Sequence, residues 1–209
     1  MKAVLLNGSP KRKDSASACL LACLKACLPE SLSIVELSLS RPVLPEAAFD
    51  QLEGAEAWVF AFPLYADGVP SHLLSCLLQL EALPLCRGKK IFALVNCGFY
   101  EGSQTEPALE VLQNWCGKAG AHWQGGVGTG GGGSLVMLLK PPWGRGPCAS
   151  IHRALTALAK AMAQGQAMEN SFVTVDLPRF LYRLAGQLGW RQMIKANGGQ
   201  GKDLNRQMD

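Results

Sequence analysis

The sequence of 209 residues predicts an α/β fold, a doubly wound parallel sheet of five strands in the order 2-1-3-4-5 with a C-terminal helical extension. Short apolar runs alternate along the chain with segments of helical periodicity. The runs 57–62 and 91–95 are apolar throughout, as in strands that helices cover on both faces. The first run, 3–6, stops at an Asn-Gly-Ser-Pro turn and leads into a helical segment, the kind of turn where such sheets bind ligands.

The expected elements are strands at 3–6, 32–37, 57–62, 91–95 and 122–129 and helices at about 15–28, 70–83 and 104–118. The run 32–37 alternates partly between apolar and polar residues, which is typical of an edge strand. Pro70 opens a helix with leucines on one side, because proline fits the first helical turn. Glycines interrupt 122–129, which indicates a weak last strand. Strong central runs and weak outer ones match the flavodoxin-like strand order.

Residues 1–170 are expected to form this domain, and 171–209 a helical extension packed on it. In the tail, apolar residues such as Phe180, Leu184 and Trp190 alternate with arginines, which predicts an amphipathic basic helix. Such a helix would cap the sheet or a dimer seam, or rest on an anionic membrane surface. Packing of this helix on the protein is favoured over binding to a membrane surface.

Composition limits the functional classes. Apolar residues make up 48% of the chain and charged residues 17%, which is ample for a sizeable core. A net charge of +4 does not by itself indicate nucleic-acid binding. The apolar run before Asn7 is too short for a signal peptide, and no run approaches the roughly 20 apolar residues of a membrane span. We therefore expect a cytoplasmic protein.

The eight cysteines do not predict a metal centre or disulfides. Cys19, Cys23 and Cys27 recur every four residues as a helical stripe, unlike the C-x-x-C spacing of clusters and zinc sites. Free thiols in a reducing compartment behave as small buried hydrophobes. The histidines are His72, His122 and His152. Because they lie far apart without metal-type spacing, structural or surface roles are favoured, and no metal site is expected.

The turn after the first strand predicts an anion site. A helix N-terminus leaves backbone N–H groups unpaired and carries roughly half a positive charge. The hydroxyls of Ser9, Ser15 and Ser17 would add bonds to a terminal phosphate. Neither the Walker pattern nor G-x-G-x-x-G occurs here, so the loop suits a monophosphate better than a pyrophosphate. The alternative is an ordinary strand-to-helix turn with Ser15 as its N-cap.

Two further loops, 63–70 and 96–103, follow the two central strands. Each combines an aromatic residue, a polar residue and glycine, and so offers a flat face together with backbone N–H groups. A flavin needs a wall against its ring and donors at its polar edge, which tune the electronics of the cofactor. The alternative is that the aromatics pack and the glycines make turns.

These segments resemble the NAD(P)H-dependent FMN reductase and oxidoreductase family of flavodoxin-like flavoproteins, over about residues 1–130. The resemblance implies FMN with its phosphate on the 9–17 loop and its ring between the 63–68 and 96–101 loops. The implied cofactor residues are Ser9, Lys11, Ser15, Ala16, Ser17, Pro63, Leu64, Tyr65, Ala66, Asp67, Asn96, Cys97, Gly98, Phe99, Tyr100 and Glu101. The phosphate loop departs from the family form in its Lys-Arg-Lys-Asp run, 11–14, and the cysteine segment of iron–sulfur relatives is missing.

The resemblance also implies two-electron chemistry, with a hydride passing from NADPH or NADH through FMN N5 to a quinone, flavin or nitro compound in a ping-pong cycle. Homodimers are usual in the family. The chemistry is centred on the flavin, so no protein residue is expected to be catalytic, and a G-x-S-x-G hydrolase motif is absent. The alternatives are a flavodoxin-type electron carrier without nicotinamide activity, or a non-catalytic flavodoxin-like binding protein. Such carriers tend to be strongly acidic, which favours the enzyme for a chain of charge +4.

A stretch without Asp or Glu, 111–168, contains five cations and predicts a positive surface. Within it, 128–133 formally satisfies G-x-G-x-x-G but lacks the first-strand context of a dinucleotide site. One hypothesis is that this loop, with Gly130 and Arg145, contacts the phosphates of incoming NADPH. A mobile surface loop with solvated charges is an equally weighted alternative.

Overall fold

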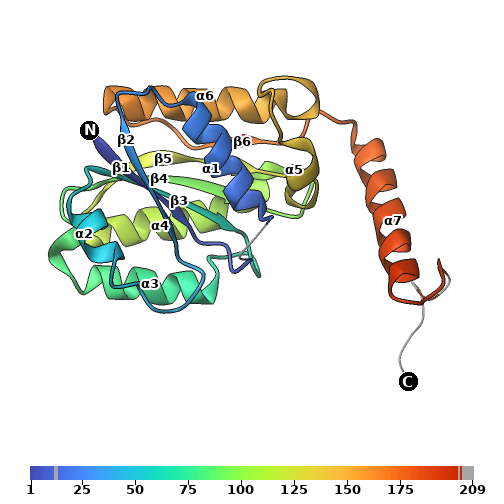
Figure 1. Ribbon diagram of the computed structural model, residues 1–209, viewed down its shortest axis with the longest axis horizontal. Helices are drawn as coiled ribbons and strands as arrows, with labels where there is room; N and C mark the ends of the chain where they lie inside the picture. The colour runs from blue at the N-terminus through green and yellow to red at the C-terminus, as the bar shows by residue number, and fades with distance from the viewer. Residues whose placement is uncertain (12–13, 202, 204–209) are drawn as a thin grey trace. The chain divides into compact units, whose positions relative to one another are not determined.

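The computed structural model describes residues 1–11, 14–201 and 203, and it divides into two compact units, Met1–Val175 and Asp176–Asp209 (Figure 1). The first unit is built on a sheet of six parallel strands in the order β2-β1-β3-β4-β5-β6. The strands are β1 (Lys2–Asn7), β2 (Ser33–Ser38), β3 (Ala57–Pro63), β4 (Lys90–Asn96), β5 (His122–Thr129) and β6 (Ser171–Val173). The parallel α/β class is confirmed.

The predicted five-stranded sheet of order 2-1-3-4-5 is wrong, because β6 pairs with β5 and extends the sheet beyond it. The glycines of β5 explain the difference. A Cβ on Gly128 would lie 2.0 Å from Thr105 Oγ1 and 2.8 Å from Phe172 Cδ1. These glycines therefore allow close approach of neighbouring segments rather than marking a weak last strand.

Helices cover both faces of the sheet in this unit. They are α1 (Ala16–Cys27), α2 (Ala48–Glu53), α3 (Ser71–Glu81), α4 (Glu106–Ala119), α5 (Gly132–Leu138) and α6 (Ala149–Gln164), with 3-10 turns at Pro84–Cys86, Gly102–Thr105 and Gly146–Cys148. In Figure 1, α1 and α6 lie side by side on one face, and α3 and α4 lie on the other. The helices predicted at 15–28, 70–83 and 104–118 correspond to α1, α3 and α4.

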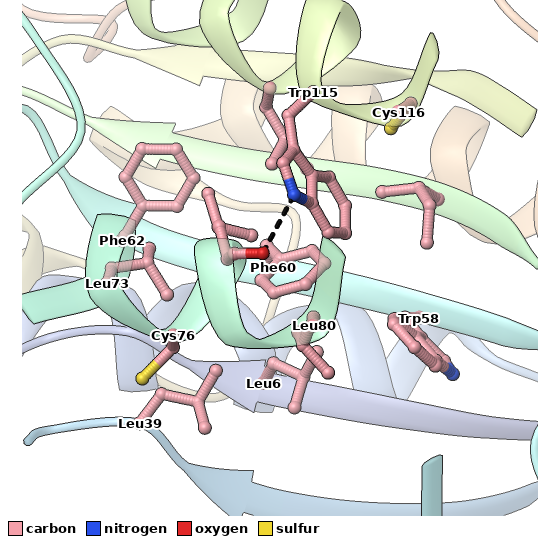
Figure 2. Packing of buried hydrophobic residues seen from close by; sticks show 14 of the residues in the cluster. Leu6, Leu39, Trp58, Phe60, Phe62, Leu73, Cys76, Leu80, Trp115 and Cys116 are labelled. Carbon is pink, nitrogen blue, oxygen red and sulfur yellow. Dashed lines mark hydrogen bonds between the residues drawn. The ribbon is translucent and has the colours of Figure 1, made fainter. Parts of the chain in front are cut away.

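The core on the α3–α4 face is built from alternate residues of β3, which fits a strand period of two. Trp58, Phe60 and Phe62 point into it and are fully buried (Figure 2). The ring of Trp115, on α4, meets Phe60 edge to face with centroids 5.8 Å apart. Its indole N–H donates to the Leu77 carbonyl of α3 over 3.0 Å. This packing holds β3 and both helices together.

The packing of α1 against α6 brings together residues that are distant in the sequence. None of the eight cysteines, all of which lie among the described residues, forms a disulfide. The ligand atoms of Cys23, Cys27 and His152 lie within 4.8 Å of one another. The sequence spacing of the histidines contained no sign of this proximity, because it arises from contact between two helices.

The second unit contains α7 (Arg179–Ala196), close to the amphipathic helix predicted in the tail. None of the residues of α7 is buried, and Phe180, Leu184 and Trp190 are exposed. Residues 171–173 of the predicted extension form β6 and pair with β5, whereas packing of the rest of the tail on the preceding domain stays a prediction. Among the described residues, no helix has the length and apolar character needed to cross a membrane.

Candidate functional site

A cavity of about 190 Å³ lies where the carboxyl ends of β1, β3 and β4 meet the start of α1. Its lining consists of Ser9, Lys11, Asp14, Ser15, Ala16, Ser17, Pro63, Leu64, Tyr65, Asn96, Gly98, Gly132, Gly133 and Val136. The three predicted segments therefore contribute to one cavity. The carboxyl edge of a parallel sheet is where ligands bind in this class of fold.

The start of α1 contributes hydrogen-bond donors to the cavity. Ser15 is the N-cap, and its hydroxyl oxygen accepts the N–H of Ala18 at 3.1 Å. The first intrahelical bond runs from Cys19 N–H to the Ser15 carbonyl at 3.1 Å, so the N–H groups of Ala16 and Ser17 precede the helical ladder. Ser9 is buried, and its hydroxyl oxygen accepts the Lys11 N–H at 3.3 Å. Among the described residues, no acceptor is found for the hydroxyl protons of Ser9 and Ser15.

Ser17 has a different role from the one expected. Its hydroxyl donates to the Asn96 side-chain oxygen at 2.9 Å, and both residues are buried. This bond ties the first turn of α1 to the last residue of β4. Ser17 thus offers the cavity its backbone N–H, while its hydroxyl proton is already donated.

Tyr65 begins a tight turn at the edge of the cavity. Tyr65 and Gly68 exchange backbone hydrogen bonds of 3.0 Å in both directions. The two central residues, Ala66 and Asp67, have φ of 46° and 55°, a conformation that L-residues rarely adopt. The tyrosine is 47% exposed and lines the cavity, whereas Ala66 and Asp67 do not. The turn therefore presents one aromatic side chain to the cavity.

Of the loop after β4, only Asn96 and Gly98 line the cavity. The Cys97 thiol is buried and donates to the Glu101 carbonyl at 3.5 Å. Burial raises the pKa of Cys97, with the Glu101 carboxylate acting in the same direction and a backbone hydrogen bond from Phe99 opposing them. Cys97, Phe99, Tyr100 and Glu101, assigned to the cofactor by the resemblance, lie outside the lining.

Four lining residues were not predicted from the sequence. Gly132, Gly133 and Val136 belong to the first turns of α5, which lies beside the end of β4 because Gly132 N–H donates to the Cys97 carbonyl at 2.7 Å. The glycine run that begins α5 was noticed, but as a site for NADPH. Asp14 is the fourth, and its φ of 51° is unusual for a residue other than glycine.

The two residues proposed to bind the nicotinamide nucleotide do not line the cavity. Gly130 is buried against backbone, since a Cβ there would lie 2.0 Å from the Tyr100 carbonyl oxygen. Arg145 is exposed and precedes the 3-10 turn Gly146–Cys148. A role for either one in binding NADPH stays a prediction.

The charges around the cavity oppose one another. The positive end of α1 and the Lys11 ammonium favour an anion, whereas the Asp14 carboxylate disfavours it. Lys11 and Asp14 are both exposed, so solvent weakens both effects. The basic residues at 12 and 13, between them, lie outside the described residues. Among the described lining residues, the hydrogen-bond donors at the start of α1 favour an anion independently of these two exposed charges.

Comparison with known proteins identifies the fold. No protein-family model matches the sequence, and no curated protein matches it. The structure is similar to NAD(P)H:quinone oxidoreductase from Methanothermobacter marburgensis, with a TM-score of 0.57 and 16% identity over 78% of this chain and 96% of that chain. An FMN-dependent NADH-azoreductase from Bacillus anthracis, solved in complex with FMN, gives a TM-score of 0.54 and 14% identity over 78% of this chain and 100% of that chain. A flavodoxin from Streptococcus pneumoniae gives a TM-score of 0.54 and 14% identity over 79% of this chain and 99% of that chain. The protein therefore has the flavodoxin-like fold, as the pattern of strands and helices predicted.

Proposed function

We propose that the cavity at the start of α1 binds FMN and that the protein is an FMN-dependent NAD(P)H oxidoreductase. The observation that carries this proposal is the meeting, in one cavity, of a serine-capped helix start and an exposed tyrosine from the neighbouring strand end. The first of these suits a phosphate and the second suits a planar ring. The fold is one that FMN-dependent reductases use, as the azoreductase solved with FMN illustrates.

The residues present fit this cofactor. Ser9 and Ser15 would donate their hydroxyl protons to phosphate oxygens, and the N–H groups of Ala16 and Ser17 would bind the same group. The cavity is smaller than the roughly 300–1,000 Å³ common for small-molecule sites, so the flavin ring would extend to its edge, against Tyr65. Bound there, FMN would supply two-electron transfer between a nicotinamide and an acceptor.

The chain's own contribution would be binding and positioning. The α1 dipole neutralises phosphate charge, and the Ser17–Asn96 bond keeps the helix start fixed against β4. Donor and acceptor would use the same exposed flavin face in turn, which gives ping-pong kinetics. Use of NADPH or NADH as donor is part of this proposal, as are a small-molecule acceptor and a homodimeric state. These three points rest on the resemblance to the FMN reductase family.

One experiment separates the functional classes. The purified full-length protein is titrated with FMN, followed by flavin fluorescence, and then mixed anaerobically with NADPH or NADH in a stopped-flow instrument. We expect saturable binding and rapid bleaching of the flavin absorbance by at least one of the two donors. Binding without bleaching would identify an electron carrier and overturn the oxidoreductase. Absence of binding would overturn the FMN site.

Replacing Asp14 by asparagine should tighten FMN binding by about two- to fivefold, since exposed charges typically interact by about 0.5–1 kcal/mol. Asparagine is nearly isosteric and adopts positive φ readily, so the backbone at φ 51° is kept. The measurement is the FMN dissociation constant at low salt. Glu30→Gln is the matched control, because Glu30 is an exposed carboxylate beyond the other end of α1. Equal constants for Asp14→Asn and the wild type would show that Asp14 does not face the phosphate.

A further inference from the structure

A cluster of metal-binding side chains lies between α1 and α6, away from the candidate FMN site. Cys23 and Cys27 are on successive turns of α1, and His152 is in the first turn of α6. The two helices pack side by side (Figure 1). Cys27 ends α1 and lies roughly 16 Å along the helix axis from Ala16, which lines the cavity at its start. The cluster and the cavity are therefore separate features of one helix.

The distances within the cluster suit a tetrahedral ion. The three ligand atoms lie within 4.8 Å of one another, and Cys27 Sγ is 3.6 Å from His152 Nε2. With Zn–S near 2.3 Å and Zn–N near 2.0–2.1 Å, a tetrahedral angle separates sulfur from nitrogen by about 3.6 Å. A thiol–imidazole hydrogen bond would also give this distance, but it would need only Cys27 and His152. The thiol of Cys23 adds a third ligand atom within 4.8 Å, which such a pair would not need.

The imidazole of His152 is oriented for binding. Its Nε2 faces Cys27. Its Nδ1 side faces Gly144, where a Cβ would lie only 3.1 Å from Nδ1. Gly144 has φ of +82°, which favours glycine, so the close approach to the ring is built into the backbone. A larger residue at that position would push the ring from its place.

A fourth thiol lies close by. Cys148 immediately precedes α6, four residues before His152, just as Cys23 precedes Cys27 by four. Burial raises the pKa of Cys23 to about 12, and the neighbouring Cys27 and Cys148 contribute in the same direction. Cys148 therefore neighbours Cys23 from the residue that precedes α6. This arrangement differs from the C-x-x-C spacing that a sequence search for zinc sites looks for.

We propose that this cluster is a zinc site, with Cys23 Sγ, Cys27 Sγ and His152 Nε2 as ligands and the neighbouring Cys148 as a candidate for the fourth position. Thiolate and imidazole together suit Zn²⁺, which prefers four ligands of these kinds. Each Zn–S bond forms as a thiol proton leaves to solvent, and the ion loses water ligands as the protein ligands bind. Cys23 is fully buried, while Cys27 and His152 are partly exposed and give the ion an entry path.

The test uses Co²⁺ as a spectroscopic substitute for zinc. The full-length protein is stripped of metal under reducing conditions and titrated with Co²⁺, and Zn²⁺ is then added. We expect one equivalent of Co²⁺ to produce thiolate-to-metal charge-transfer bands and the visible bands of a tetrahedral ion. One equivalent of Zn²⁺ should abolish both sets of bands. The readout does not involve flavin, so its outcome is independent of the proposed oxidoreductase activity.

Variants assign the ligands. Cys27→Ser and His152→Ala should each weaken Co²⁺ binding by at least about 100-fold, since even losing an outer-shell partner costs 10–100-fold. Cys19→Ser is the matched control, because Cys19 lies on the same stripe of α1 but its thiol neighbours Asp14 and Lys140 instead. Circular dichroism and the urea midpoint of each metal-free variant establish that it is folded.

Three outcomes would overturn the site. One is the absence of charge-transfer bands in the wild-type protein. Another is bands of equal strength in Cys27→Ser and His152→Ala, which would indicate adventitious binding elsewhere. The third is an equal loss of binding in Cys19→Ser, which would assign the signal to a different set of thiols.

Discussion

Replacing Gly130 by alanine is expected to destabilise the protein by about 3 kcal/mol or more, at the upper end of the cost of overpacking a well-packed site. A Cβ at this position would lie 2.0 Å from the Tyr100 carbonyl oxygen, 2.7 Å from its carbon and 2.9 Å from Gly102 N. All three atoms belong to the backbone, so no flexible side chain can move aside. The Gly130 N–H also donates to Val173 of β6 at 2.9 Å, and relieving the clash would stretch that bond.

The measurement is the free energy of unfolding from urea denaturation. Gly117→Ala is the matched control, because Gly117 is exposed within α4 and an added Cβ meets nothing within 4 Å. That substitution should stabilise the protein by roughly 0.5–1 kcal/mol, the ordinary gain from replacing glycine in a helix. If Gly130→Ala unfolds at the wild-type urea concentration, the close packing of the 96–103 loop on the end of β5 is incorrect.

Replacing Ser15 by aspartate should weaken FMN binding by at least about 100-fold while leaving the fold intact. Aspartate caps helices as well as serine does, and its charge is favourable at the positive end of α1. The same charge would face the phosphate. Two unit charges 4 Å apart repel by about 4 kcal/mol at an effective dielectric constant of about 20, which more than accounts for a 100-fold loss.

Ser15→Asn isolates the effect of charge, because asparagine has nearly the same shape as aspartate and is an equally good N-cap. We expect it to bind FMN within about tenfold of the wild type, the cost of one lost hydroxyl hydrogen bond. The dissociation constants of both variants come from the same fluorescence titration. Similar constants for the aspartate and asparagine variants would mean that no phosphate lies at the start of α1.

The bounds of the central strands could be predicted closely because they depend on consecutive residues of the chain. Residues 57–62 and 91–95 are uninterrupted apolar runs, and β3 and β4 extend them by no more than one residue at either end. A strand buried on both faces must be apolar along its length. The Ser15 cap and the start of α1 were recognisable for the same reason, because capping depends on adjacent residues.

The remaining features depend on contacts between distant segments. The glycines of β5 predicted a weak last strand. Gly128 instead leaves room for Thr105 and Phe172, which approach it from other elements. The position of the Cys97 thiol follows from the fold of its loop, which turns it toward the Glu101 carbonyl. His152 lies beside Cys27 only because α6 packs on α1. Contacts of this kind cannot be predicted from the composition of the chain or from the spacing of its residues.

The packing of α1 along α6 has a consequence for any ligand at the start of α1. A rigid helix held along its length keeps its first N–H groups aimed at one point before an anion arrives. The entropy of ordering that site is therefore lost during folding and not at each binding event. Such preorganisation leaves more of the interaction energy available as affinity. The affinity for a small anion would therefore depend on how tightly α1 and α6 pack against each other.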